Sequence, residues 1–127
     1  MYDKNNIFAK ILRGEIPPNK VYENEYAMSF HDVNPMFDTH VLIIPRGEYV
    51  NALEFSANAS DDEQLGFWKC FSKTVEALGI KDDCNIVSNI GKNAPFASQS
   101  VPHYHLHLVA GAARPEFYAE VKSKHFN

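Results

Sequence analysis

The sequence predicts an α+β domain in which one antiparallel sheet packs against helices on one side. The first observation is the order of elements: a helix, three strands, a long helix and two more strands. This order lacks the regular alternation of strand and helix that a parallel sheet requires. The second is size and composition, since 127 residues, 45% of them hydrophobic and 22% charged, fit one domain with one core. We therefore expect a single domain over residues 1–127, with a five-stranded antiparallel sheet and two helices.

The first half of the chain supplies a short helix and three strands. Residues 6–13 carry apolar side chains at helical spacing, and Gly14 follows as a stop signal. Residues 20–23 and 26–32 are expected to form a hairpin. A turn at Asn34-Pro35 then precedes a β-branched apolar run at residues 39–45, which predicts a buried strand.

The second half supplies a long helix and two strands. Ser60 and Glu63 form a capping box that predicts a helix over residues 61–78, and Gly79 ends it. One apolar stripe on this helix is expected to face the core: Leu65, Trp68, Phe71, Val75 and Leu78. Two strands are expected at residues 84–89 and 103–109, joined by a polar loop.

Charge and composition exclude several classes of function. The net charge is −4 and the 12 Lys and Arg residues are scattered, so we expect no nucleic-acid-binding surface. No apolar run is long enough to cross a membrane, and no targeting leader is evident, so we expect a protein of the cytoplasm or another reducing compartment. Cys70 and Cys84 lack metal or redox spacing and sit among apolar neighbours, which predicts two buried thiols.

A row of histidines marks the last strand: His103, His105 and His107. Side chains alternate between the two faces of a strand, so the three imidazoles are expected on one face. The intervening Tyr104 and Leu106, with Leu108, are expected on the core face. One face of the strand is thus a row of titratable groups, which packing does not explain.

Three explanations of this row are open from the residues alone. The imidazoles can be solvated surface groups, although three in register would repel one another when charged. They can bind a metal, but His103 and His107 are about 13 Å apart along a strand, so one zinc ion would need two of them together with His40. They can also supply a nucleophile flanked by hydrogen-bond donors for chemistry at phosphorus.

Four segments resemble the histidine triad superfamily and occur in its order. They are residues 7–17, residues 30–35, residues 39–46 and the run Gln99-Ser100-Val101-Pro102-His103-Tyr104-His105-Leu106-His107. The branch that the chain resembles is the histidine triad nucleotide-binding (Hint) proteins. The resemblance implies one domain of that fold, a homodimer whose sheets join, and no metal or other cofactor. Residues 92–97 depart from the family's pattern as a longer loop.

The resemblance also implies catalytic roles. His105 matches the nucleophile that attacks the α-phosphorus and becomes nucleotidylated. His107 matches a donor to the phosphate, and His40 matches a fourth histidine near the site. His103 matches a residue whose main-chain carbonyl accepts a hydrogen bond from His105 and so fixes its tautomer.

Substrate-binding roles follow in the same way. Asp32 matches an acceptor for the ribose hydroxyls, Asn89 a polar group near the phosphate, and Ser100 a hydroxyl beside the leaving group. Gln99 belongs to the same signature and is expected in the binding site. An apolar slot for the base is expected from three residues: Phe8, Ile11 and Phe30.

The implied reaction is hydrolysis of a purine nucleoside phosphoramidate through a nucleotidyl-histidine intermediate. A dinucleoside polyphosphate hydrolase is the alternative within the same chemistry. The alternative from another class is a nucleotide-binding or interaction module with little turnover. The expected partners are a purine nucleotide and a second copy of the chain.

Overall fold

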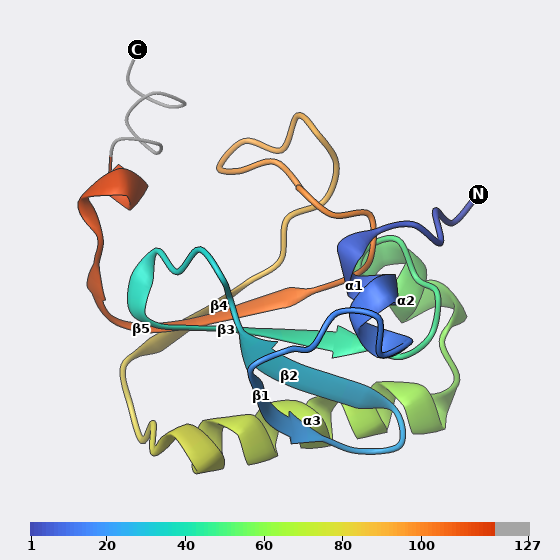
Figure 1. Ribbon diagram of the computed structural model, residues 1–127, viewed down its shortest axis with the longest axis horizontal. Coiled ribbons are helices and arrows are strands. Elements are labelled where there is room, and N and C mark those ends of the chain that lie inside the picture. Colours follow the sequence, from blue (N-terminus) through green and yellow to red (C-terminus); the bar gives the residue numbers. More distant parts are fainter. Residues whose placement is uncertain (119–127) are drawn as a thin grey trace.

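A five-stranded antiparallel sheet forms the centre of the computed structural model, which describes residues 1–118 (Figure 1). The strands are β1 (Lys20–Glu23), β2 (Ala27–His31), β3 (Phe37–Pro45), β4 (Cys84–Val87) and β5 (Leu106–Ala113). Their order across the sheet is β1-β2-β3-β5-β4, and every neighbouring pair is antiparallel. The predicted α+β class and five-stranded antiparallel sheet are confirmed.

In the described part of the chain, three helices flank the sheet: α1 (Ile7–Leu12), α2 (Ala52–Asn58) and α3 (Asp61–Leu78). The sequence predicted two, and α2 was missed. Its capping signal was present, because the Asn51 side chain accepts a hydrogen bond from the main-chain N–H of Glu54 at 3.0 Å. A further helical turn occupies residues 115–118.

The helices lie on both faces of the sheet, not on one side as expected (Figure 1). Phe8 and Ile11 of α1 pack on one face, against Met28, Phe30, Leu42 and Ile44. On the other face, α2 and α3 cover a second cluster that includes Ile43 and Leu108. Alternate residues of the central strands therefore feed two separate cores, which explains the continuous apolar run at residues 41–45.

Helix α3 has the predicted caps, but the face that it buries against the sheet is not the predicted apolar stripe. The Ser60–Glu63 capping box forms, and Gly79 takes a left-handed φ of 70° at the C-cap. The buried residues are Gly66, Phe67, Cys70 and Thr74, whereas two members of the expected stripe are exposed: Leu65 (56%) and Trp68 (48%).

A close approach fixes this rotation of α3. A Cβ atom on Gly66 would lie 2.4 Å from a ring carbon of Tyr26, so only glycine fits at that contact. About two turns further on, Thr74 shares a hydrogen bond with Ser29 of β2 at 2.6 Å. Contact with the sheet therefore outweighs the apolar stripe in setting which face of α3 is buried.

Strand β4 forms an exposed edge of the sheet. All four of its residues are exposed, including Ile86 and Val87. Cys84 is consequently exposed, so the prediction of two buried thiols is wrong for Cys84 and confirmed for Cys70. Within residues 1–118, no helix is long and apolar enough to cross a membrane.

Candidate functional site

The histidine row lies at the entrance to β5, on the sheet face that α1 covers. The strand begins at Leu106, so His103 and His105 precede it, and only His107 is a strand residue. The alternation predicted from the sequence nevertheless holds, because Tyr104, Leu106 and Leu108 belong to the core on the α3 side. The rings of His105 and His107 are 5.0 Å apart.

A main-chain carbonyl sets the tautomer of His105. Its Nδ1 lies 2.8 Å from the carbonyl oxygen of His103. A carbonyl only accepts hydrogen bonds, so Nδ1 carries the proton and Nε2 of the neutral ring carries a lone pair. The Phe8 ring packs edge-on against His105 at 5.0 Å and holds the imidazole plane. The geometry thus presents one unprotonated nitrogen on a fixed ring.

Both ring nitrogens of His103 make hydrogen bonds. Its Nε2 lies 2.8 Å from the carbonyl oxygen of Pro45, and its Nδ1 accepts a hydrogen bond from the Tyr2 hydroxyl at 2.5 Å. The side chain is fully buried. Because neither nitrogen is free, His103 contributes to the site through its backbone.

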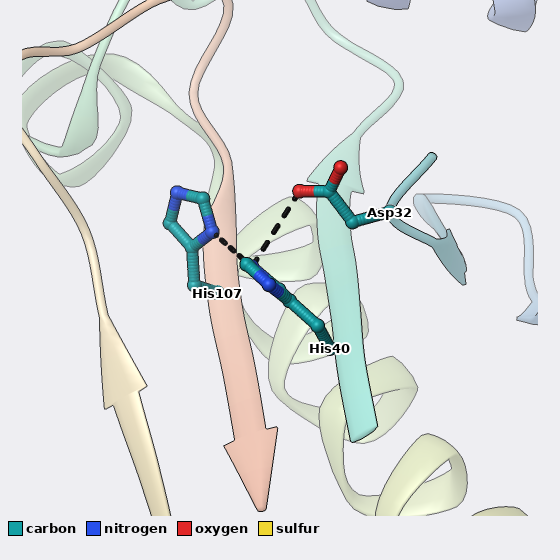
Figure 2. A group of neighbouring side chains, drawn as sticks. All are labelled: Asp32, His40 and His107. Carbon is teal, nitrogen blue, oxygen red and sulfur yellow. Dashed lines mark hydrogen bonds and ion pairs between the residues drawn. The ribbon is translucent and has the colours of Figure 1, made fainter. Parts of the chain in front are cut away.

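His40 and His107 form a second ordered chain of hydrogen bonds (Figure 2). The main-chain N–H of Met36 donates to Nδ1 of His40 at 3.0 Å, so the proton of the neutral His40 ring is on Nε2. That Nε2 lies 2.9 Å from Nδ1 of His107 and 3.5 Å from Oδ2 of Asp32. His40 therefore donates its Nε2 proton to Nδ1 of His107, the nearer acceptor, and the Nε2–H of His107 has no hydrogen-bond partner among residues 1–118.

Burial keeps these imidazoles uncharged. Desolvation lowers the pKa of His103 and of His107 to about 4. It also lowers the pKa of His105, against the opposing effect of the His103 carbonyl, and the pKa of His40, against the Asp32 carboxylate. At neutral pH the row therefore holds neutral nitrogens, as the hydrogen-bond directions require.

One set of side chains has the donor types for a metal ion. Asp32, His40 and His107 each offer one ligand atom, and these atoms lie within 4.8 Å of one another. One carboxylate and two imidazoles match the donors that zinc accepts in proteins. The set contains one member of the row with His40 and Asp32, and not two members of the row with His40 as the sequence suggested.

An open cavity of about 820 Å³ lies beside His107 and His40. Its walls come from the β2–β3 turn, strand β4, the loop at residues 94–98 and Phe117. Figure 1 shows this loop and the helical turn at 115–118 on the same side of the sheet as α1. A volume of this size is typical of a small-molecule site.

Three of the expected substrate-binding residues line this cavity: Asp32, Asn89 and Ser100. Asp32 also serves its turn, because its Oδ1 accepts from the main-chain N–H of Asn34 at 2.9 Å. Its Oδ2 faces His40. The carboxylate therefore has a structural hydrogen bond on one oxygen and faces the site with the other.

The other four expected binding residues lie elsewhere. Phe8, Ile11 and Phe30 are buried in the core beneath α1 and do not line the cavity. Gln99 stabilises the loop that follows Gly91. Its side-chain amide donates to the carbonyls of Val50 and Val101 and accepts from the N–H of Gly91. These residues support the walls of the site.

Sequence reasoning missed three residues that organise the site. Met36 acts through its N–H on His40, Tyr2 acts on His103, and the Ser88 hydroxyl donates to the carbonyl of His105 at 3.0 Å. A main-chain donor leaves no sequence signal. Tyr2 lies 101 residues before its partner, so local pattern does not reveal the contact.

Comparison with known proteins identifies the family. A family model described as the HIT domain matches residues 13–114. A 13.2 kDa HIT-like protein of Azospirillum brasilense is 46% identical over 111 residues, covering 87% of this chain and 88% of the relative. A HIT-like protein of Methanocaldococcus jannaschii is 42% identical over 106 residues, covering 81% of this chain and 76% of the relative.

A solved structure agrees. The chain resembles a HIT family hydrolase from Clostridium thermocellum with a TM-score of 0.75 and 34% identity, covering 87% of this chain and 93% of that one. Fold, histidine row and sequence relatives agree, and the chain belongs to the histidine triad (HIT) family.

Proposed function

We propose that the protein hydrolyses nucleoside phosphoramidates at the α-phosphorus through a nucleotide covalently attached to His105. The observation that carries this proposal is the hydrogen bond from Nδ1 of His105 to the carbonyl of His103. It leaves Nε2 as a fixed, uncharged nucleophile, which is what attack on phosphorus requires. The resemblance to solved structures described as HIT family hydrolases supports it.

The hydrogen-bond order also places a donor at the leaving group. Nε2 of His105 forms a bond to phosphorus while the phosphorus–nitrogen bond breaks, its electron pair going to the amine. The departing nitrogen takes a proton from water, while Nε2–H of His107, whose ring the His40 contact orients, donates a hydrogen bond to the departing group. A second water then displaces His105 from phosphorus and releases its proton to the solvent. The products are the amine and the nucleoside monophosphate.

The walls of the cavity favour an amine over a polyphosphate as leaving group. A dinucleoside polyphosphate would expel a multiply charged phosphate, and such groups are usually held by Arg or Lys. Within residues 1–118, the cavity is lined by neither. The phosphoramidate is therefore the first candidate and the dinucleoside polyphosphate the second.

Release of AMP from adenosine phosphoramidate tests the proposal. Wild-type protein is expected to turn the substrate over, and His105→Asn is expected to lose activity by at least about a thousandfold. His31→Asn is the matched control, because this histidine ends β2 and does not line the cavity. A His105→Asn variant that hydrolyses as fast as wild type would contradict the nucleophile.

The same assay separates the alternatives. Tight binding of AMP without turnover would favour a binding module. Activity lost on treatment with a chelator and restored by zinc would replace the metal-free scheme with one in which Asp32, His40 and His107 hold the ion.

We further propose a homodimer that joins two sheets through β4. Within residues 1–118, this edge strand pairs with β5 on one side only, and it exposes Ile86 and Val87. An exposed apolar edge is a template for pairing with another strand. Light scattering is expected to give twice the chain mass, and Ile86→Lys is expected to lower it to one chain. A monomeric wild type would contradict the dimer.

A further inference from the structure

His105 is held both at its ring and at its main chain. At the ring, Nδ1 donates to the carbonyl oxygen of His103 and the Phe8 ring packs edge-on at 5.0 Å. At the main chain, the carbonyl oxygen of His105 accepts a hydrogen bond from the Ser88 hydroxyl at 3.0 Å. The ring contacts fix the tautomer and the plane, whereas the main-chain contact fixes the point from which the side chain extends. The position of Nε2 therefore depends on both.

The Ser88 contact lies just beyond the end of the β4–β5 ladder. Strand β4 ends at Val87, which pairs with His107, and β5 begins at Leu106. His105 precedes the strand, and the link from Ser88 to its carbonyl is made by a hydroxyl in place of a main-chain N–H. A carbonyl in a partly buried position needs a donor. The side chain of Ser88 thus connects the end of β4 to the main chain of His105.

This hydrogen bond differs from the other kind of serine contact in the chain. Ser56 also donates to a main-chain carbonyl at 3.0 Å, but its acceptor is Leu53 in the preceding turn of the same helix. Ser88 and its acceptor are 17 residues apart and belong to different segments. A local contact satisfies its own helix, whereas the Ser88 contact fixes one segment relative to another.

Ser88 also faces the cavity. It is half-buried, and it lines the cavity wall together with its neighbours Asn89 and Ile90. The hydrogen bond therefore sets the spacing between this wall and the main chain of His105. Attack on phosphorus needs reacting atoms about 3–3.5 Å apart and aligned, and a displacement of about 1 Å can cost roughly a hundredfold in rate. A contact that fixes this spacing has a direct effect on the first chemical step.

We infer that Ser88 is a positioning residue for His105. Its hydroxyl holds the main chain of His105 where Nε2 reaches phosphorus, and it forms or breaks no bond with the substrate. The inference rests on the proposed phosphoramidate hydrolysis and adds to it a residue outside the histidine row. The step that depends on Ser88 is formation of the bond between His105 and phosphorus, and binding of the nucleotide does not depend on it.

Two measurements on Ser88→Ala separate this step from binding. The first is amine release from an adenosine phosphoramidate in a single turnover with protein in excess, and the second is the Kd for AMP by calorimetry. Amine release is expected to slow about tenfold, while the Kd for AMP changes by less than about twofold. A general disturbance of the site would change both.

A conservative variant and a control complete the test. Ser88→Thr keeps the hydroxyl and is expected to release amine at a rate within about threefold of wild type. Ser56→Ala loses a hydroxyl-to-carbonyl hydrogen bond of the same length, outside the cavity, and is expected to keep the wild-type rate.

The outcomes distinguish the two proposals. Wild-type protein that binds AMP but releases no amine would mean that the proposed function fails, and the positioning role with it. Release by Ser88→Ala at the wild-type rate would overturn the positioning role and leave the chemistry standing. The role would also be overturned if AMP binding weakened as much as amine release slowed, or if Ser88→Thr were as slow as Ser88→Ala.

Discussion

The His105 ring donates its Nδ1 proton to the main-chain carbonyl oxygen of His103, 2.8 Å away, and to no side chain of the row. The first histidine therefore acts on the second through its backbone. Its own ring is used elsewhere, in hydrogen bonds to Pro45 and Tyr2. Removing the ring of His103 and removing the ring of His105 should thus have different consequences.

We expect His103→Ala to cost stability more than chemistry. The change leaves a buried void and unpaired partners, which lowers the free energy of unfolding by about 2–4 kcal/mol. The carbonyl remains, so kcat of the folded variant should fall by less than about tenfold. Urea unfolding and steady-state kinetics measure the two effects. A stable His103→Ala variant as inactive as His105→Asn would contradict a backbone role.

Tyr2→Phe tests the hydrogen bond between the Tyr2 hydroxyl and the His103 ring. The variant keeps the ring and removes the hydroxyl that donates to Nδ1 of His103, leaving a buried acceptor without a partner. We expect the free energy of unfolding to fall by about 1–2 kcal/mol. Tyr22→Phe is the control, because the Tyr22 hydroxyl makes no hydrogen bond with residues 1–118. Equal stability losses in the two variants would contradict the contact.

Stability should decrease as the pH falls from neutral. Burial lowers the pKa of His103 to about 4, against about 6.5 in an unfolded chain. Between these values the unfolded state binds a proton that the folded state does not, so acid favours unfolding. For His103 alone the loss should be about 2 kcal/mol between pH 7 and pH 5, and His107 acts in the same direction.

Urea unfolding at the two pH values measures this loss. It should shrink in His103→Ala, which lacks the titrating ring. A wild-type stability that does not change between pH 7 and pH 5 would contradict neutral, buried imidazoles.

Asp32→Asn should weaken binding of a ribonucleotide more than it slows chemistry. The amide oxygen can still accept from the Asn34 N–H, so the turn is retained, while the negative acceptor for the ribose is lost. We expect KM to rise about tenfold for the adenosine substrate and little for its 2′-deoxy analogue. Asp38→Asn is the control, because Asp38 accepts from the Ala112 N–H and does not line the cavity. An equal rise for both substrates would contradict ribose recognition.

Much of the fold could be predicted because local signals and packing agree. The capping box at Ser60, the turn at Asn34-Pro35 and the apolar run in β3 each specify one structure, and the structure contains all three. Helix α2 was missed although Asn51 caps it locally, and the other predictions that failed concern tertiary contacts. The rotation of α3 follows from the contact between Gly66 and Tyr26, and the exposure of Cys84 follows from the position of β4 at an edge.

The site shows the same division. Strand periodicity correctly separated the imidazole face from the core face around Tyr104 and Leu106. Periodicity cannot specify partners, however, because hydrogen bonds to main-chain groups such as the Met36 N–H leave no trace in the sequence. The aromatic side of the cavity was also hidden, because Phe37, Phe96 and Phe117 come from three separate segments that only the fold brings together.

The covalent intermediate tests the central claim most directly. Wild-type protein would be mixed with an adenosine phosphoramidate, quenched within one turnover, digested, and mapped by mass spectrometry under conditions that preserve phosphorus–nitrogen bonds. The account predicts one adenylyl group, on His105, that disappears as AMP forms. An adduct on His103 or His107, or AMP release by His105→Asn at the wild-type rate, would contradict it.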